Sequence, residues 1–353
     1  MRLPRCMQIF NQSIKSEQTR IAYTKGLNRF LKICKISSPE KLLKMSQKDT
    51  QILVEDYVFS LKTQVNPSTV ETYLTGVKLF FVMNDVILNW SKIKKFLPER
   101  PKRLGSKAYT TEDVRSIISK SPNPRYKAMI LFMASSGVRV GSLHEMQMKH
   151  LTNMPHDCKS ILVYPKTKDE YTTFISNEAS LALEEYHNER IRQGDTITDD
   201  SFLFTNGKNW DFKKMSNESV TITLKYHISK IHRTKESENR YEKQTNHAFR
   251  KRFNTILKSN ESVNISLAER LMGHSQTVSL DNSYFDPSLE NLFKEYLKVL
   301  PDLLVAERYT LTSENIQKQQ RIEELESKNV KIELLESQMR EMQAHLKNIN
   351  NQP

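Results

Sequence analysis

Several side chains in the second half of the chain have types and spacings that could perform phosphoryl chemistry. The segment LMGHSQTVSLDNSYFDP, residues 271 to 287, places His274 and Tyr284 ten positions apart. A phenol becomes a nucleophile when its proton is removed and nearby cations match the developing charge. Tyr284 could therefore attack a phosphodiester while His274 hydrogen-bonds the same phosphate.

Cationic side chains that could serve such a reaction occur in three other segments. Arg139 follows a glycine in SSGVRVGSL, and His247 and Arg250 in HAFRKRF share one face if the segment is helical. Two arginines from different segments can hold both nonbridging oxygens of one phosphate in a transition state that gains negative charge. Lys166 begins a predicted turn between two strands, from which a lysine can protonate a departing alkoxide. Taken singly, each could be a packing or surface residue.

The composition narrows the class of partner. The chain has 353 residues, 37% of them hydrophobic, which is enough for two modest cores. Its formal net charge of +13 predicts a polyanionic partner. The first residues, MRLPRCMQIFNQS, lack an apolar run of signal-peptide length, and AMILFMA at 128 to 134 is too short to span a bilayer. We therefore expect a cytoplasmic protein with no membrane contact.

No pattern in the sequence indicates a metal or a cofactor. Cys6, Cys34 and Cys158 lie far apart, and the clustered histidines are spaced by five or six residues, whereas helical ligands recur at three or four. None of the eight glycines belongs to a glycine-rich phosphate-binding motif. We therefore expect no metal and no small-molecule cofactor.

The elements before residue 98 are predicted to be helices. Apolar residues recur at helical spacing from Ile21 to Cys34 and from Val70 to Phe81, and Ser68 with Glu71 forms a capping-box pattern. Residues 1–98 are therefore predicted to form an all-helical domain of four or five helices.

A basic segment, SKIKKFLPERPKRLGSK at 91 to 107, follows this bundle, and its prolines and glycine prevent one continuous helix. We interpret residues 99–108 as an interdomain linker. A solvated connector without a partner is the alternative. The expected DNA-binding residues here are Lys92, Lys94, Lys95, Arg100, Lys102 and Arg103.

Residues 109–306 are predicted to form a second, mainly helical domain with a small antiparallel sheet. TTEDVRSII at 110 to 118 begins a helix with acids in its first turn, and YKAMILFMASSGV at 126 to 138 is a buried helix. SILVYP at 160 to 165 and YTTFIS at 171 to 176 are strands joined by a polar turn. The predicted fold class is therefore mainly α.

The ordered set of motifs resembles the tyrosine recombinase (phage-type integrase) family over about residues 10 to 300. An arginine in GxRxG, a lysine in a β-turn, HxxR, GHS and a tyrosine follow a helical domain and a basic linker. The resemblance implies that a SAM-like core-binding domain and a catalytic domain clamp duplex DNA. It also implies cleavage through a 3′-phosphotyrosyl link, without ATP or metal.

The resemblance assigns roles to the matching positions. Lys168 is the alternative to Lys166, because one sequence does not fix the hairpin register, and Tyr296 is the alternative nucleophile. The implied roles are phosphate clamping for Arg139 and Arg250, general base or acceptor for His247, phosphate contact for His274, general acid for Lys166, and nucleophile for Tyr284.

Two positions depart from the family pattern. Ser142 stands where an acidic residue is common, and Lys251 stands where a histidine is frequent. These changes affect the residues that support the catalytic set. The segment YFDP, followed by a helix ending EYLKVLPDLL, looks most like archaeal and archaeal-virus members.

The C-terminal region contains two apolar patterns. SLENLFKEYLKVL at 288 to 300 has one apolar stripe, which could pack in its own subunit or dock on a neighbour. Residues 307–353 carry eight Glu against seven Lys and Arg, so the rest of the chain holds about +14. Leu325, Ile332, Met339 and Leu346 recur every seven residues, with Lys328 interrupting the second heptad position. The tail is therefore a marginal coiled coil or a solvated helix.

The sequence thus predicts a site-specific DNA recombinase that binds double-stranded DNA at specific sites. The family implies a homo-tetramer on synapsed DNA, which would be nucleoid-associated when bound. Two alternatives are a type IB topoisomerase, which uses similar chemistry as a monomer, and an inactive architectural DNA-binding protein.

Overall fold

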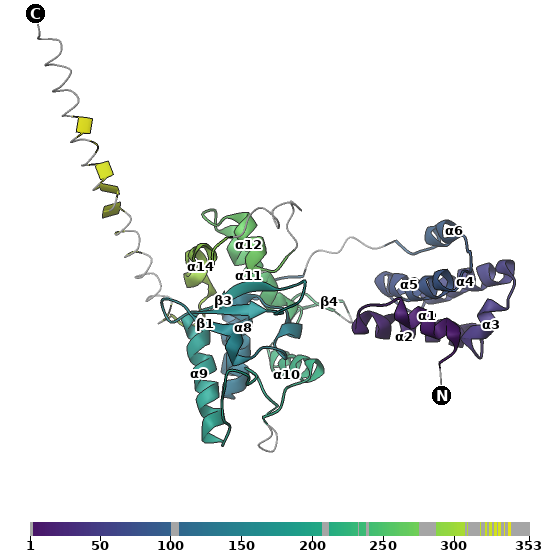
Figure 1. The fold of residues 1–353 in the computed structure, drawn as a ribbon, viewed down its shortest axis with the longest axis horizontal. Coiled ribbons are helices and arrows are strands. Elements are labelled where there is room, and N and C mark those ends of the chain that lie inside the picture. The colour runs from purple at the N-terminus through teal and green to yellow at the C-terminus, as the bar shows by residue number, and fades with distance from the viewer. Residues whose placement is uncertain are drawn as a thin grey trace, which may run out of the picture. The chain divides into compact units, whose positions relative to one another are not determined.

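A computed structural model of the chain describes residues 3–99, 106–206, 212–231, 233–237, 240–274 and 287–307, with isolated positions between 309 and 339. The chain divides into two units, Met1–Leu104 and Gly105–Pro353. Figure 1 shows the elements of both units, and each unit is built around its own hydrophobic core.

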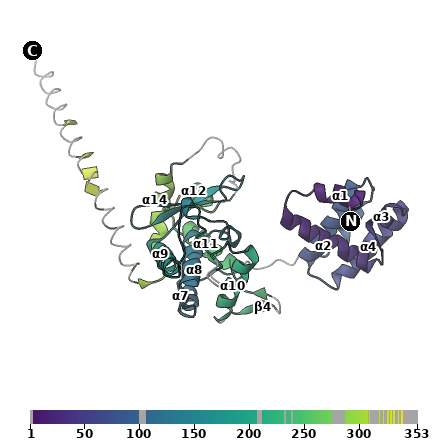
Figure 2. The same ribbon diagram turned by 60° about the horizontal axis from the view of Figure 1, so that its bottom comes forward.

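The first unit is a bundle of helices around an aromatic core (Figure 2). Edge-to-face contacts join the buried rings of Phe10, Phe30, Tyr57, Phe80 and Phe81. Four or five helices were expected, and the described residues form six, because two short ones escape a periodicity pattern. The helices are α1 (Arg5–Gln12), α2 (Glu17–Ile33), α3 (Pro39–Leu43), α4 (Gln47–Lys62), α5 (Pro67–Met83) and α6 (Trp90–Lys95).

The start of α5 differs from the sequence expectation. A capping box at Ser68 was predicted, but the N-cap residue is Asn66 and Pro67 occupies the first helical position. Proline suits that position because its fixed φ matches the helix and its missing N–H would have no partner there. The prediction was wrong because it treated Pro67 as lying outside the helix.

The second unit has one helix at its centre. Helix α8 (Pro124–Ser136) is buried along most of its length and contacts α7 (Thr111–Ser119), α9 (Asn177–Arg192), α11 (His247–Ser259) and β3 (Figure 1, Figure 2). Helix α7 begins with the expected acids, Glu112 and Asp113, in its first turn, and a capping box joins Thr110 and Asp113. The remaining helical elements of the described residues are η1 (Val140–Ser142), η2 (Met148–His150), α10 (Asn217–Ser229), α12 (Ile265–Leu271) and α14 (Leu289–Leu303).

The sheet beside α8 has three antiparallel strands in the order β1-β2-β3. Strand β2 (Lys159–Val163) pairs with β3 (Tyr171–Ile175), and the last pair before the turn is Val163 with Tyr171. These two strands were predicted. Strand β1 (Leu151–Asn153) and the separate pair β4 (Lys235–Ser237) and β5 (Arg240–Tyr241) were not, because two or three residues are too few to show alternation.

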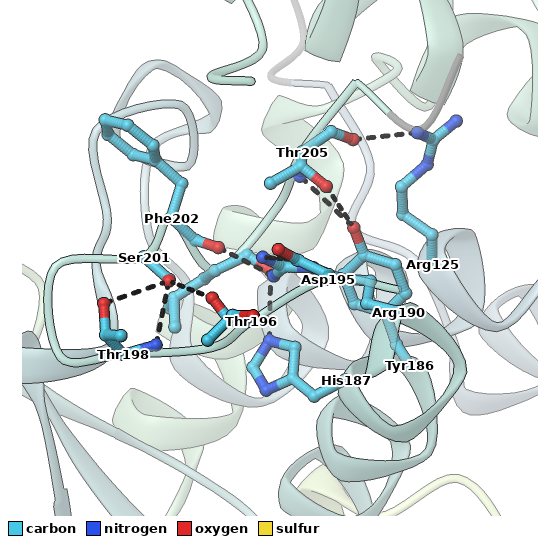
Figure 3. Close-up of polar contacts among 11 residues, drawn as sticks. Arg125, Tyr186, His187, Arg190, Asp195, Thr196, Thr198, Ser201, Phe202 and Thr205 are labelled. Carbon is cyan, nitrogen blue, oxygen red and sulfur yellow. Dashed lines mark hydrogen bonds and ion pairs between the residues drawn. The ribbon is translucent and has the colours of Figure 1, made fainter. Parts of the chain in front are cut away.

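A buried polar network fixes the carboxyl end of α9 (Figure 3). The Arg190 guanidinium contacts the Asp195 carboxylate at 2.6 and 2.7 Å, and the Nε2–H of His187 donates to the Leu203 carbonyl at 3.1 Å. Burial lowers the pKa of His187 to about 4, so the ring is neutral near pH 7. Arg125 at the start of α8 donates to the Thr205 carbonyl at 2.8 Å. The network therefore ties α8, α9 and the following loop together, and it contains none of the predicted catalytic residues.

Helix α14 packs within its own subunit, which settles one alternative left open by the sequence. Its apolar stripe is buried against α11, α12 and β3. The Tyr296 hydroxyl donates to the Ser135 carbonyl at 3.1 Å. Beyond the helix, the buried Glu178 carboxylate accepts the backbone N–H groups of Val305 and Ala306 at 2.7 and 3.1 Å. The chain is thus held in its own domain up to the start of the tail.

The described residues confirm the mainly helical fold class with a small antiparallel sheet. In this part of the chain, no helix is both long enough and apolar enough to cross a membrane.

Candidate active site

Arg139 is positioned by the sharp end of α8. Gly137 terminates the helix with φ +62°, a left-handed conformation that glycine adopts without strain. A Cβ at Gly137 would also collide with the Phe253 ring, so the close approach of α8 and α11 requires glycine. The chain then turns at Arg139, whose backbone carbonyl accepts a hydrogen bond from the Ser142 hydroxyl at 2.7 Å. The Arg139 side chain is exposed.

Arg250 lies in the first turn of α11 and is buried. Its Nη1 donates to the Gly137 carbonyl at 2.8 Å, and its Nη2 donates to the Met272 carbonyl. These carbonyls stand at the carboxyl ends of α8 and α12, where a helix carries partial negative charge. One guanidinium therefore joins the ends of two helices to the beginning of a third.

The Arg139 side chain approaches the same backbone segment as Arg250. Arg139 Nη1 and Nη2 lie 3.5 and 3.4 Å from the Gly273 carbonyl, which is next to the Met272 carbonyl in the chain. Burial lowers the pKa of Arg250 below its ordinary value, and Arg139 lowers it further, whereas Tyr171 and Tyr164 raise it. No carboxylate of the described residues is among the groups that shift this pKa. Two cations thus converge, and none of the described carboxylates pairs with either of them.

His247 shares this electrostatic environment. It is the first residue of α11, one helical turn before Arg250. Partial burial lowers its pKa, and Arg250, Lys251 and Arg139 lower it further. A neutral imidazole is therefore favoured near pH 7, and its ring can accept a proton.

His274 is oriented by a carboxylate that sequence reasoning missed. Its Nδ1–H donates to the Glu269 carboxylate at 2.5 Å, and the Lys258 ammonium pairs with the same carboxylate. Burial alone would raise the pKa of Glu269, but the hydrogen bonds from Lys258 and His274 hold it below its ordinary value. Glu269 and His274 are five residues apart, a spacing that no motif singled out.

The hairpin lysines lie in a strained turn. Tyr164 and Lys166 have φ of +54° and +61°, and such a conformation costs a non-glycine residue about 1–3 kcal/mol. The backbone N–H of Lys166 donates to the Glu170 carboxylate at 2.5 Å. The side chains of Lys166 and Lys168 are both exposed. The choice between these two lysines therefore remains a prediction.

Two phenols that the sequence did not single out lie beside the arginines. A Cβ at Gly141, two residues after Arg139, would be 3.8 Å from the Tyr164 hydroxyl. The Tyr171 ring packs against Gly273, and its hydroxyl lies beside Arg250. Burial raises the pKa of both phenols above the ordinary value. Both residues flank the hairpin turn, where only the lysines had been considered.

Several predicted residues lie outside the described residues or away from this cluster. Tyr284, Arg100, Lys102 and Arg103 are outside the described residues. Tyr296, the alternative nucleophile, is fully buried, and burial raises its pKa well above the ordinary value. A fully buried phenol cannot reach DNA, so Tyr296 is a core residue.

The predicted DNA-binding lysines of the first unit lie on α6. All three are exposed, but the Lys92 ammonium pairs with the Glu55 carboxylate at 2.7 Å, whereas no carboxylate of the described residues pairs with Lys94 or Lys95. In the described part of the chain, no three side chains of His, Cys, Asp or Glu gather as a metal site would require.

Comparison with known proteins places this geometry in a family. The family model described as "Phage integrase family" matches residues 107–290, which is more than half of the chain. No curated protein matches the sequence.

Solved structures share the fold at low sequence identity. An integrase of the Tn1549 transposon, in complex with a circular intermediate DNA, matches with a TM-score of 0.53 and 16% identity, over 82% of this chain and 98% of that chain. A lambda integrase dimer bound to a COC′ core site matches with a TM-score of 0.52 and 12% identity, over 81% of this chain and 96% of that chain. At such identities the likeness concerns the fold.

The matched residues 107–290 include Arg139, Lys166, His247, Arg250, His274 and Tyr284, and they extend from the amino end of the second unit to the first turn of α14. The chain therefore belongs to the phage integrase family.

Proposed function

We propose that this chain recombines DNA at specific sites by using Tyr284 as its nucleophile. As a member of the phage integrase family, the protein is a tyrosine-type site-specific recombinase. In the proposed step, the Tyr284 oxygen bonds to the phosphorus, the bond from phosphorus to the 5′ oxygen breaks, and the 5′ hydroxyl leaves with a proton. A 5′ hydroxyl of another strand then reverses the step. The number of phosphodiester bonds is conserved, so the resealing needs no energy source.

One observation carries the proposal: Arg139 and Arg250 meet at adjacent carbonyls, and no carboxylate of the described residues shifts the pKa of Arg250. Both lie near the amino end of α11, where the helix adds partial positive charge. Such a cluster favours a doubly coordinated anion, and a phosphate whose charge rises in the transition state gains most from it.

The roles that we propose for the two histidines and the hairpin lysine depend on which of these groups can accept or donate a proton. To His247, whose pKa is lowered, we assign the role of accepting the Tyr284 proton. His274, held by Glu269 through Nδ1, presents its other ring nitrogen for a hydrogen bond with the phosphate. We assign Lys166 as the acid that protonates the departing 5′ oxygen, with Lys168 as the alternative.

The two departures from the family pattern have structural roles that are compatible with activity. Ser142 holds the Arg139 backbone through its hydroxyl, and the Lys251 ammonium donates to the Ser106 carbonyl at the start of the second unit. These contacts favour an active enzyme over an inactive architectural protein.

We further propose that four subunits assemble on two synapsed duplexes, and that the C-terminal tail supplies a weak contact between them. In the tail, Leu325, Ile332 and Met339 expose 46%, 52% and 58% of their surface. A near-neutral helix can associate where the rest of the chain, at about +14, repels its copies.

We also propose domain boundaries at residues 98, 108 and 306, an archaeal or archaeal-virus origin, and a nucleoid location when the protein is bound to DNA.

The nucleophile is tested by substituting Tyr284→Phe. We expect loss of the covalent protein–DNA adduct on nicked suicide duplexes, in buffer containing EDTA, with duplex binding nearly unchanged because one hydroxyl contributes little contact. Tyr226→Phe, at an exposed position of α10, is the matched control and should keep cleaving. Cleavage by Tyr284→Phe would refute the assignment, and relaxation of plasmid without a recognition site would favour a topoisomerase.

The general acid is tested with Lys166→Ala and Lys168→Ala, each serving as the control for the other. The variant that lacks the acid should cleave an ordinary duplex slowly but recover on a bridging 5′-phosphorothiolate, because a thiolate leaves without protonation. We expect this rescue for Lys166→Ala alone. Rescue of Lys168→Ala alone would transfer the role, and rescue of neither would remove both lysines from the step.

The tail is tested by deleting residues 307–353, which leaves the contact of Glu178 with Val305 and Ala306 intact. Single-site cleavage should be unchanged, whereas recombination between two sites should fall. A full-length variant with Leu325→Ser and Ile332→Ser should behave likewise, because both side chains are exposed. Equal loss of both activities would mean that the tail supports the catalytic fold, and loss of neither would make it a solvated appendage.

A further inference from the structure

Tyr171 occupies a place that the roles assigned above do not explain. It is the first residue of β3, directly after the lysine-bearing turn, and it pairs with Val163. Its ring packs against Gly273, where φ is +57° and where a Cβ would overlap the ring. The carbonyls of Met272 and Gly273 are the ones that receive Arg250 and Arg139. The ring of Tyr171 therefore contacts the short backbone segment whose carbonyls accept hydrogen bonds from both arginines.

The hydroxyl of Tyr171 is the second observation. It is buried and completes no hydrogen bond within the described residues, although it lies close enough to the Arg250 guanidinium to raise the pKa of that group. Leaving a buried hydroxyl unpaired is costly, and native structures seldom do so without a functional or structural reason. A small rotation of Arg250 would bring an N–H to this oxygen.

The contacts of the Arg250 guanidinium explain why it would rotate. Both Nη atoms of Arg250 already donate to carbonyls, and burial disfavours its charge. When a phosphate binds at the two arginines, the guanidinium must turn part of its N–H fork toward the new anion. An oxygen of Tyr171 at the side of the fork can accept an N–H that loses its carbonyl.

We propose that Tyr171 is a positioning residue for the arginine pair: its ring fixes the Met272 and Gly273 carbonyls, and its hydroxyl accepts from Arg250 when the phosphate is bound. The inference rests on the proposed recombinase function and adds a residue that acts through Arg250 without touching the reacting atoms. The competing interpretation is that Tyr171 only fills space between β3 and α12.

The test compares two scissile groups in the same suicide duplex, an ordinary phosphodiester and a methylphosphonate. Replacing one nonbridging oxygen by a methyl group makes the phosphorus centre neutral, so cleavage depends less on an oriented pair of cations. A variant with misplaced arginines therefore loses rate on the phosphodiester much more than on the methylphosphonate. A variant that is merely less stable loses rate on both.

The variants are Tyr171→Phe, which keeps the ring, and Tyr171→Leu, which removes it. At saturating protein, we expect Tyr171→Phe to slow adduct formation on the phosphodiester about tenfold, as for loss of a hydrogen bond to a charged group. Tyr171→Leu should slow it about a hundredfold, as for a misplaced catalytic group. Both variants should cleave the methylphosphonate within about threefold of the unsubstituted protein, a small part of either loss.

The matched control is Tyr186→Phe, which removes another buried hydroxyl of the same unit, bonded to Thr205 at 3.1 Å. It should leave the ratio of the two cleavage rates unchanged. If both Tyr171 variants also keep the ratio of the unsubstituted protein, Tyr171 only fills space and the inference is overturned. If the unsubstituted protein forms no adduct on either duplex, the recombinase proposal itself fails.

Discussion

The contact of one buried guanidinium with two helix ends organises the catalytic unit. Arg250 lies in the first turn of α11 and donates to carbonyls at the carboxyl ends of α8 and α12. Each end is formed by a glycine in a left-handed conformation, and in each case an aromatic ring lies where a Cβ would project, Phe253 at Gly137 and Tyr171 at Gly273. Moving any of these three helices would separate the arginines, so the fold and the site share one constraint.

The same contact explains why the cluster of Arg139 and Arg250 stays positively charged. Carbonyls stabilise a guanidinium without neutralising it, since they contribute partial charges and no proton. A carboxylate would hold Arg250 as well, but it would also cancel the field that an incoming phosphate needs. Partial burial lowers the pKa of His247, and the positive charge of the arginines lowers it further, whereas Glu269 contacts His274 and Lys258. The Glu269 carboxylate thus orients His274 and does not neutralise the arginines.

Sequence reasoning found the residues that carry a motif and missed those that act through geometry. The HxxR and GxRxG patterns identified Arg250 and Arg139, the apolar run at 126 to 138 predicted α8, and two β-rich runs predicted the β2–β3 hairpin. Glu269 was missed because its five-residue spacing from His274 belongs to no motif, and Tyr164 and Tyr171 were missed because each acquires its role from a neighbour distant in the chain or from an unusual φ. The capping error at Ser68 has a local cause, since Pro67 can stand either before a helix or at its first position.

Helix α14 shows where pattern alone is insufficient. Its apolar stripe suits a neighbour as well as its own subunit, and only the Tyr296 hydroxyl on Ser135 and the Glu178 carboxylate on the following backbone decide the matter. Because α14 is held in its own subunit, the proposed contact with a second copy is assigned to the tail beyond residue 306.

The central claim is that the forked geometry of Arg250, and not merely its charge, creates the phosphate site. The most direct measurement is the rate of adduct formation by Arg250→Lys on a suicide duplex at saturating protein, with Arg192→Lys at an exposed position of α9 as the control. An ammonium is a point charge and lacks the planar fork that joins the Gly137 and Met272 carbonyls while facing a phosphate. We predict nearly unchanged duplex binding and a cleavage rate lowered by about a hundredfold or more, with the control unaffected. A cleavage rate for Arg250→Lys equal to that of the unsubstituted protein would contradict the account.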